Sequence, residues 1–241
     1  MGVSSGDGVQ ARTLFEASGK PEIAIETPTY YLGFKSSQPT RHVVGKNFSL
    51  NIAKDQLRAA MRDRRERLSP VESRFCAERI AERLLKLPEI ISVRSIALYS
   101  PIRGEVSTEP AYSQLRRGVE AIYFPRVPDS GTGPIEFVRI NDWQQLIRGY
   151  AGILEPPPSF PAAPIDEIGA MVIPGLAFDI HGQRLGWGKG FYDRVLKKYS
   201  GIRVGLGYDF QLLDQIPSGV HDEPMAFVIT EKRVVSTGGI G

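Results

Sequence analysis

Four glycines and two cations fall within nine residues, from Gly182 to Gly190, and this stretch holds the side chains best suited to chemistry. Glycines let backbone N–H groups approach an anion closely because they carry no Cβ atom, and Arg184 and Lys189 add positive charge. A helix expected from Phe191 would add the positive end of its dipole. The pattern predicts a phosphate-binding loop. The spacing matches neither the Rossmann nor the Walker motif, so on spacing alone an ordinary glycine-rich turn remains the alternative.

Charged residues elsewhere in the chain are candidates for the same site. Lys54 and Arg58 are four residues apart, so they share one face of a helix. Glu105 follows an apolar strand, at a position where parallel sheets place ligands. Asp193 and Asp222 suit Mg²⁺, which prefers one or two carboxylates together with water and substrate phosphates. Each has a plainer alternative, because helix cations and loop carboxylates are most often solvated.

Strands and helices alternate along the chain and must position these residues. Apolar runs predict strands at residues 95–99, 121–124, 135–140, 169–173, 202–208 and 226–230, the last at a sheet edge. Amphipathic spacing and capping signals predict helices at residues 54–68, from 70 to about 86, from 107 or 108 to 118, and from 191 to about 199. Strands separated by helices imply an α/β fold: a doubly wound, mainly parallel sheet with helices on both faces and ligands at the strand carboxyl ends.

The N-terminal part of the chain divides into an extension and two helices. Residues 1–50 are predicted to be an extension that is partly disordered, because polar residues and prolines prevail there. Ser69, Pro70 and Glu72 form a capping box that restarts the chain, so the first two helices are expected to form an N-terminal helical hairpin. The remaining arginines of the first helix are expected on a solvated charged face: Arg62, Arg64, Arg65 and Arg67.

Composition limits the class of protein further. The 241 residues suffice for one sizeable α/β domain with an extension. A net charge of +3 and a pI near 9.0, without a concentrated basic patch, favour small anionic ligands over nucleic acid. Cys76 is the only cysteine, so neither an intrachain disulfide nor a cysteine zinc site is expected. With no bilayer-length apolar run and no signal-peptide core, we expect a cytoplasmic protein without a membrane partner.

Residues 174–194, PGLAFDIHGQRLGWGKGFYDR, resemble the signature of the 5-formyltetrahydrofolate cyclo-ligase family, in which PGL-x-FD, G-x-RLG-x-G-x-G and YDR follow each other at this spacing. The resemblance covers about residues 52–235. It implies a cyclo-ligase domain at residues 51–236, followed by a short tail at 237–241, and a sheet of the NagB/RpiA/CoA-transferase type. A protein of this family would act in one-carbon metabolism, and we expect a monomer.

The resemblance also implies an activity and its residues. The family converts 5-formyltetrahydrofolate into 5,10-methenyltetrahydrofolate, with ATP as co-substrate and Mg²⁺ as cofactor, and releases ADP and phosphate through a phosphorylated formyl (iminium phosphate) intermediate. By this resemblance the catalytic residues are Lys189 and Arg184, and the metal ligands are Asp193 and Asp222. ATP binding falls to Lys54, Arg58, Arg184, Leu185, Gly186, Trp187, Gly188, Lys189, Gly190, Phe191 and Tyr192. Folate binding falls to Tyr99, Glu105, Trp187, Gly188, Lys189, Gly190 and Phe191.

Two other functions stay open at the level of the sequence. A doubly wound fold could serve a sugar-phosphate or acyl-transfer enzyme that does not use ATP, or a folate- or nucleotide-binding module without turnover. Retention of Lys54, Arg58, Glu105, Lys189 and Asp193 argues against a chain that has lost its activity. Release of ADP that depends on 5-formyltetrahydrofolate would separate these functions.

Overall fold

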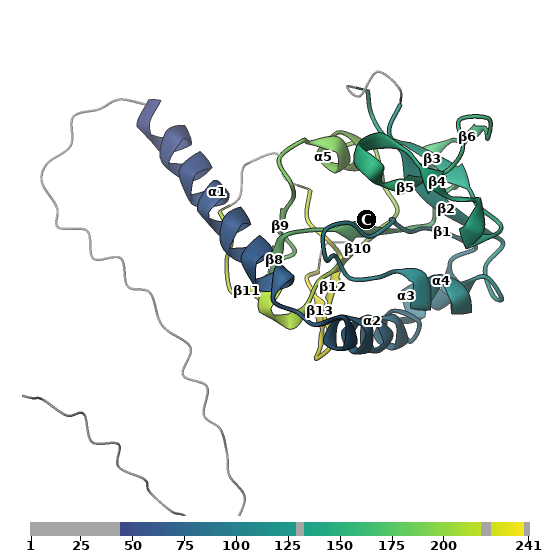
Figure 1. Ribbon diagram of the computed structural model, residues 1–241, viewed down its shortest axis with the longest axis horizontal. Coiled ribbons are helices and arrows are strands. Elements are labelled where there is room, and N and C mark those ends of the chain that lie inside the picture. The colour runs from purple at the N-terminus through teal and green to yellow at the C-terminus, as the bar shows by residue number, and fades with distance from the viewer. Residues whose placement is uncertain (1–43, 129–132, 218–222, 239–241) are drawn as a thin grey trace, which may run out of the picture. The chain divides into compact units, whose positions relative to one another are not determined.

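A computed structural model describes residues 44–128, 133–217 and 223–238, with an eight-stranded sheet at the centre of the domain (Figure 1). The strand order is β13-β12-β10-β7-β1-β2-β3-β6. In chain order the strands are β1 (Ser95–Ala97), β2 (Ala121–Arg126), β3 (Glu136–Arg139), β6 (Ala162–Ala163), β7 (Ala170–Pro174), β10 (Ile202–Leu206), β12 (Phe227–Ile229) and β13 (Val234–Ser236). The five strands from β12 to β2 are mutually parallel. Strands β13 and β3 run antiparallel to them, and β6 pairs antiparallel with β3. The predicted mainly parallel α/β sheet is therefore confirmed.

The central strands are buried on both faces, as continuous apolar runs require. In β7, Ala170 and Val172 pack into one core cluster, whereas Met171 and Ile173 pack into another on the opposite face. The first cluster includes apolar residues of α2 (Pro70–Leu84), α3 (Pro88–Ser92) and α4 (Glu109–Leu115). The second includes α5 (Phe191–Leu196). Helices thus cover both faces of the sheet, with α2, α3 and α4 below it and α5 above it in Figure 1.

The chain reverses its winding direction between β1 and β7, which pair side by side in the middle of the sheet. From β1 the chain passes through α4 to β2 on one side. From β7 it passes through α5 to β10 on the other side. In doubly wound sheets this switch point leaves a crevice at the carboxyl ends of the two strands, because the connections diverge there.

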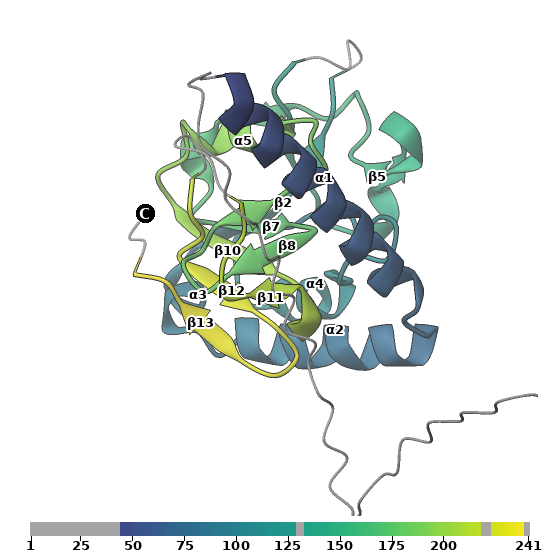
Figure 2. The same cartoon turned by 90° about the vertical axis from the view of Figure 1, so that its left-hand side faces the viewer.

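Helix α1 (Val44–Glu66) packs away from α2, so the predicted helical hairpin is wrong. Met61 of α1 packs with Leu176, Ala177 and Leu185 around a small three-stranded sheet, β11-β8-β9, where β8 spans Ala177–Asp179, β9 spans Arg184–Leu185 and β11 spans Leu212–Leu213. Helix α2 lies instead against α4 and β12. The two helices run in different directions in both views (Figure 2). Each buries its apolar stripe against a different part of the domain, which a hairpin would not allow.

Several helices and strands begin or end at residues other than those predicted. Helix α1 begins at Val44, inside the predicted extension, and residues 1–43 lie outside the described part. The Ser69 capping box is confirmed, since Ser69 Oγ accepts from the Glu72 N–H at 3.2 Å and Glu72 Oε2 accepts from the Ser69 N–H at 3.0 Å. Helix α5 ends at Leu196 rather than near Tyr199, because the following residues make tighter i→i+3 hydrogen bonds. Strand β13 covers β12, which is therefore not an edge strand.

The remaining elements are short. A two-stranded hairpin joins β4 (Ile147–Arg148) to β5 (Leu154–Glu155). Single 3₁₀ turns occur at η1 (Trp143–Gln145), η2 (Tyr150–Gly152), η3 (Ile165–Glu167) and η4 (Asp209–Gln211). Among the described helices none could cross a bilayer; even α1, with 23 residues, is rich in arginine.

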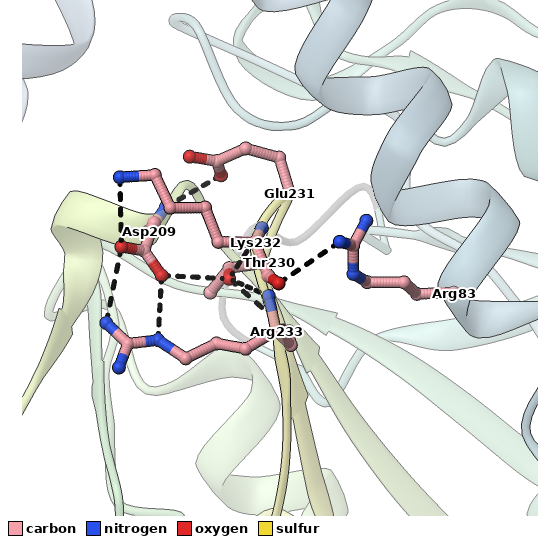
Figure 3. A network of polar contacts seen from close by, with 6 residues as sticks. All are labelled: Arg83, Asp209, Thr230, Glu231, Lys232 and Arg233. Atoms are coloured by element: carbon pink, nitrogen blue, oxygen red, sulfur yellow. Dashed lines mark hydrogen bonds and ion pairs between the residues drawn. The ribbon is translucent and has the colours of Figure 1, made fainter. Parts of the chain in front are cut away.

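A network of hydrogen bonds and ion pairs links the turn between β12 and β13 to η4 (Figure 3). Asp209 accepts hydrogen bonds from Arg233 Nε at 2.9 Å and Nη2 at 3.2 Å, and from Thr230 Oγ1 at 3.1 Å. Arg83 of α2 donates to the carbonyl of Lys232 in the same turn at 3.1 Å. The network joins α2, η4 and the last hairpin through paired groups.

Candidate active site

A pocket of about 330 Å³ opens at the switch point, beside the carboxyl ends of β1, β2 and β7. This is where a doubly wound sheet is expected to bind its ligand. The rest of its wall comes from the loop after β1, the stretch from β9 into α5, the β4–β5 hairpin, Ile135 just before β3, and one residue of α1. Its polar and aromatic lining includes Arg62, Tyr99, Arg103, Glu105, Tyr150, Glu155, Arg184, Trp187, Lys189, Phe191, Tyr192 and Asp193.

The glycines of the predicted phosphate loop are required by geometry. Gly188 and Gly190 have φ angles of 91° and 67°, a region that favours glycine. A Cβ atom at Gly186 would lie 2.7 Å from Nη1 of Arg184, so any side chain there would displace that guanidinium. Arg58 of α1 donates from Nε to the carbonyl of Gly186 at 3.0 Å, so α1 holds the loop from outside. The shape of this stretch brings two arginines, Arg58 and Arg184, against its backbone.

The predicted cations Arg184 and Lys189 and the α1 residue Arg58 all lie at the loop. Arg184 donates from Nη1 to the carbonyl of Pro174 at 3.2 Å, and its side chain is only 7% exposed. Its Nη2 pairs with Asp193, whose side chain is 50% exposed. Lys189 is exposed and lines the pocket, and the Arg58 guanidinium would lie 3.5 Å from a Cβ atom placed on Gly188. The predicted cluster of cations around the glycine loop is therefore present.

Glu105 also lines the pocket and is buried, with 7% of its surface exposed. Its Oε1 accepts from Trp187 Nε1 at 2.8 Å, and its Oε2 accepts from the backbone N–H of Ile102 at 3.1 Å. Burial raises the pKa of Glu105 above its usual value, while the hydrogen bond from Trp187 and the charge of Arg65 oppose that rise. The alternative of a solvated loop carboxylate is wrong, and a buried carboxylate with room for further donors is suited to binding a ligand.

Aromatic side chains form part of the pocket lining. Tyr99 is buried and donates its hydroxyl to the carbonyl of Val106 at 2.8 Å, and burial raises its pKa well above the usual value. Phe191 and Tyr150 form an edge-to-face pair with ring centroids 6.0 Å apart. Tyr150 belongs to the β4–β5 hairpin, which the sequence did not connect with the site.

Three arginines of the site were not predicted: Arg62, which lines the pocket, and Arg103 and Arg65, which lie beside Trp187. The Arg103 and Arg65 guanidinium carbons lie 5.1 and 5.3 Å from the ring centroid of Trp187, within range of cation–π attraction. Arg65 is only 2% exposed, so its assignment to a solvated face is wrong. The sequence did hold the signal: Arg65 follows Met61 by four residues and precedes Leu68 by three, which puts it on the apolar face of α1.

Not every predicted residue reaches the pocket. Leu185 is buried in the core beside Leu176 and Met61. Lys54 is half-buried one turn before Arg58, and neither of these two residues lines the pocket wall, although Arg58 bonds to the glycine loop. Asp222 lies outside the described residues. Within residues 44–128, 133–217 and 223–238, no group of three or more potential metal ligands occurs. Asp193 is thus the predicted metal ligand that the structure places at the pocket.

The fold and the pocket together define a class: α/β proteins with a ligand pocket at the switch point of a mainly parallel sheet. Comparison with known proteins gives the family. The sequence model of the 5-formyltetrahydrofolate cyclo-ligase family matches residues 51–231, and the chain belongs to that family. The resemblance found in the glycine loop is confirmed, and so is the prediction of an enzyme.

Relatives and a solved structure agree with this membership. The 5-formyltetrahydrofolate cyclo-ligase of Mycolicibacterium smegmatis is 31% identical over 187 residues, covering 75% of this chain and 95% of that protein. That of Escherichia coli K12 is 29% identical over 178 residues, covering 72% and 98%. The NMR structure of 5,10-methenyltetrahydrofolate synthetase from Aquifex aeolicus matches with a TM-score of 0.69 at 34% identity, covering 77% of this chain and 93% of that one.

Proposed function

We propose that this protein converts 5-formyltetrahydrofolate into 5,10-methenyltetrahydrofolate, using ATP with Mg²⁺ and releasing ADP and phosphate. One observation carries the proposal. A single pocket joins a buried carboxylate, Glu105, to a glycine loop that carries Arg184 and Lys189. The first suits the heterocycle of a folate, and the second suits a polyphosphate. Family membership supplies the substrate class.

The folate end of the site is the neighbourhood of Glu105. An amino-pyrimidinone presents adjacent N–H donors, which one carboxylate can accept together. Each Glu105 oxygen already accepts one hydrogen bond, from Trp187 and from Ile102, and each has a second lone pair. Rings such as Trp187 and Phe191 are suited to covering the faces of the heterocycle.

The ATP end is the glycine loop. Arg58 and Arg184 are held by backbone carbonyls of Gly186 and Pro174, so their guanidinium groups are already in place before a ligand arrives. Lys189 is solvent-exposed and free to swing toward a phosphate. Positive φ angles at Gly188 and Gly190 turn the backbone in a way that suits N–H contacts to anions. Preorganised donors of this kind stabilise charge that develops during phosphoryl transfer.

The residues at the pocket fit Mg²⁺ in a limited way. Asp193 is half-exposed at the wall, and its ion pair with Arg184 can exchange for a metal once phosphates occupy the arginine. Mg²⁺ commonly takes one or two carboxylates and leaves its other positions to water and substrate phosphates. In that role the ion would neutralise negative charge on the transferred phosphoryl group.

The proposed reaction needs no protein nucleophile. The formyl oxygen attacks the γ-phosphorus of ATP, and the bond to the β-phosphate oxygen breaks, so ADP leaves. The N10 nitrogen then attacks the formyl carbon and loses its proton, and the carbon–oxygen bond breaks with departure of phosphate. Arg184 and Lys189 stabilise the phosphoryl charge, while the aromatic wall around Trp187 and Tyr150 keeps water from the activated carbon.

The test is to mix the protein with Mg²⁺, ATP and 5-formyltetrahydrofolate and to follow the methenyl chromophore together with ADP. We expect one ADP per methenyl group, and no product when ATP is omitted or when a chelator removes the metal. Methenyl formation without ATP would refute the proposed reaction, as would ATP hydrolysis that ignores the folate. The cytoplasmic location and the monomeric state stay predictions from the sequence.

A further inference from the structure

We propose that Arg65 is the positioning residue for the folate end of the pocket: its contacts fix the loop that carries Glu105, and its buried charge favours the ionised form of that carboxylate. The proposal deepens the proposed function, on which it rests for the identity of the ligand. Its effect on Glu105 can be tested without any ligand.

The contacts form a short relay from α1 to the carboxylate. Arg65 reaches across to the loop after β1, where its Nη2 donates to the carbonyl of Ile102 at 3.0 Å and also to the carbonyl of Arg103. The same residue, Ile102, donates its backbone N–H to Glu105. One residue therefore accepts from the guanidinium and donates to the carboxylate. Loss of the Arg65 contact would therefore reach Glu105 through Ile102.

A simple clamp for the loop would not need a charge there. The Arg65 side chain is almost completely buried, and its Nε and Nη1 atoms are among the buried side-chain atoms of the described residues that have no hydrogen-bond partner. Burying a guanidinium with unused donors costs stability, and an apolar side chain of similar volume is often less costly. What offsets the cost is the nearby carboxylate. Glu105 is the largest influence that raises the pKa of Arg65 against the lowering by burial.

The charge of Arg65 matters because Glu105 is itself buried. Burial raises the pKa of Glu105, and Arg65 acts against that rise together with Trp187, the Ile102 N–H and Arg184. The other titratable or charged groups that face this pair are Tyr99 from the loop after β1, Tyr192 of α5, Tyr208 before η4 and Arg103 beside Trp187. All three tyrosines have raised pKa values, so they stay neutral at neutral pH and Arg65 and Arg184 supply the compensating charge.

The consequence for binding follows from hydrogen-bond chemistry. A carboxylate accepts two N–H donors of an amino-pyrimidinone, whereas a protonated carboxyl group turns one of its oxygens into a donor that would face another donor. Without Arg65, protonation of Glu105 would reach to higher pH and folate binding near neutral pH would weaken. Binding would return at higher pH, where the carboxyl group ionises again.

Trp187 offers a readout that needs neither ligand nor activity. Its indole N–H donates directly to Glu105, so protonation of that carboxylate should change its fluorescence. The chain has two tryptophans, and the other, Trp143, packs against Tyr112 and Phe124, where phenylalanine can replace it. The experiment titrates Trp187 fluorescence with pH in a Trp143→Phe background.

In that background we compare three substitutions, Arg65→Met, Arg65→Gln and Arg65→Lys, with a matched control, Arg67→Met, which removes an exposed arginine from the same region of the chain. The midpoint of the fluorescence transition should move to higher pH in Arg65→Met and Arg65→Gln, because both lose the positive charge. It should stay near the parent value in Arg65→Lys, which keeps the charge, and in Arg67→Met. Glu105→Gln should abolish the transition. The two neutral variants differ in polarity, so one can replace the other if folding fails.

Calorimetric titration with 5-formyltetrahydrofolate completes the test. At neutral pH, Arg65→Met should bind the folate about tenfold more weakly or worse, and the gap should narrow as the pH rises, while ATP binding stays unchanged. An unchanged Trp187 midpoint in a folded neutral variant would overturn the proposal and leave Arg65 a structural clamp. If the midpoint moves but the parent protein does not bind 5-formyltetrahydrofolate, the proposed function fails and the coupling of Arg65 to Glu105 stands.

Discussion

Two carboxylates of this domain, Asp209 and Glu105, differ in how they interact with arginines. Asp209, in the network of Figure 3, is 14% exposed at its side chain and receives direct hydrogen bonds from Arg233 and Thr230. Burial alone would raise its pKa, but these bonds lower it below the usual value. Glu105, in the pocket, takes its hydrogen bonds from Trp187 and Ile102 instead of from an arginine, and burial raises its pKa.

This difference distinguishes a carboxylate that stabilises the fold, Asp209, from one that is available to a ligand, Glu105. Asp209 uses its oxygens on partners from the neighbouring hairpin, so little acceptor capacity remains for a ligand. The charge of Arg65 acts on Glu105, but the Arg65 guanidinium donates its hydrogen bonds to the loop and not to the carboxylate. The Glu105 oxygens can therefore accept further hydrogen bonds. Groups that are kept ionised without being fully paired are expected where a substrate must bind. In the glycine loop, Arg58 and Arg184 bond to backbone carbonyls, and each also pairs with an exposed aspartate, Asp55 or Asp193.

The largest effect on the pocket should come from Gly188→Val. A branched side chain would force a residue with a φ of 91° into strain of about 1–3 kcal/mol and would meet the Arg58 guanidinium at 3.5 Å. We expect turnover to fall by about a hundredfold or more, because the loop can no longer approach an anion. Steady-state kinetics and ATP titration measure this, with Gly118→Ala as the control, since that glycine has open space around it. Normal ATP binding by Gly188→Val would mean that the loop is an ordinary turn.

A smaller loss is expected for Lys189→Met, which removes one cation and keeps the length of the side chain. Because Lys189 is exposed and not packed in the core, the melting temperature should stay unchanged while turnover falls by about tenfold to a hundredfold. Lys197→Met removes another exposed lysine just after α5 and serves as the control. Equal activity of the two variants would remove Lys189 from the site.

Asp209→Asn tests the carboxylate that we assign to stabilising the fold, so its stability should change and its activity should not. A folded-state pKa below the unfolded value means that the ionised carboxylate stabilises the fold above the unfolded pKa, and that this contribution is lost as the pH falls. We therefore expect Asp209→Asn to lower the free energy of unfolding by about 2 kcal/mol at neutral pH, and the difference from wild type to shrink in acid. Denaturant unfolding at several pH values measures this.

The matched control is Glu82→Gln, which breaks the exposed ion pair between Arg79 and Glu82. Exposed pairs of this kind contribute less than about 1 kcal/mol. If the two variants lose the same stability, the network of Figure 3 is an ordinary surface feature. If Asp209→Asn loses activity at full stability, the division into structural and functional carboxylates is wrong.

Much of the domain could be predicted because its signals are local. The capping box at Ser69, the apolar strand 169–173 and the glycine pattern around Gly188 each depend on a few neighbouring residues, and all three are present as expected. Pairing and packing are not local. The strand β13 that covers β12, the hairpin that brings Tyr150 to the pocket and the separate packing of α1 and α2 depend on residues far apart in the sequence.

The two missed features of α1 have physical causes of their own. Its start at Val44 was missed because residues 44–53 include Gly45, Asn47 and Ser49, which are weak helix formers, so local propensity gives no signal. Arg65 was missed because a charged residue on an apolar face is usually discounted as solvated. A buried carboxylate such as Glu105 can stabilise a buried arginine, but the sequence does not show that Glu105 and Arg65 are close in space.

The smallest effect should follow removal of residues 1–43, and it tests where the catalytic domain begins. Every residue assigned to the pocket lies beyond Val44, so the chain 44–241 should keep turnover within about twofold of the full chain.

A second chain, 54–241, loses the first ten residues of α1. It would leave Arg58 in the first, frayed turns of the helix and loosen its bond to Gly186. We expect weaker ATP binding from that chain and an unchanged affinity for the folate, since Arg65 lies further along α1. Steady-state kinetics on both chains would decide the matter: equal ATP affinities would show that the first ten residues of α1 do nothing for the site, and a loss of activity in 44–241 would place part of the site within residues 1–43.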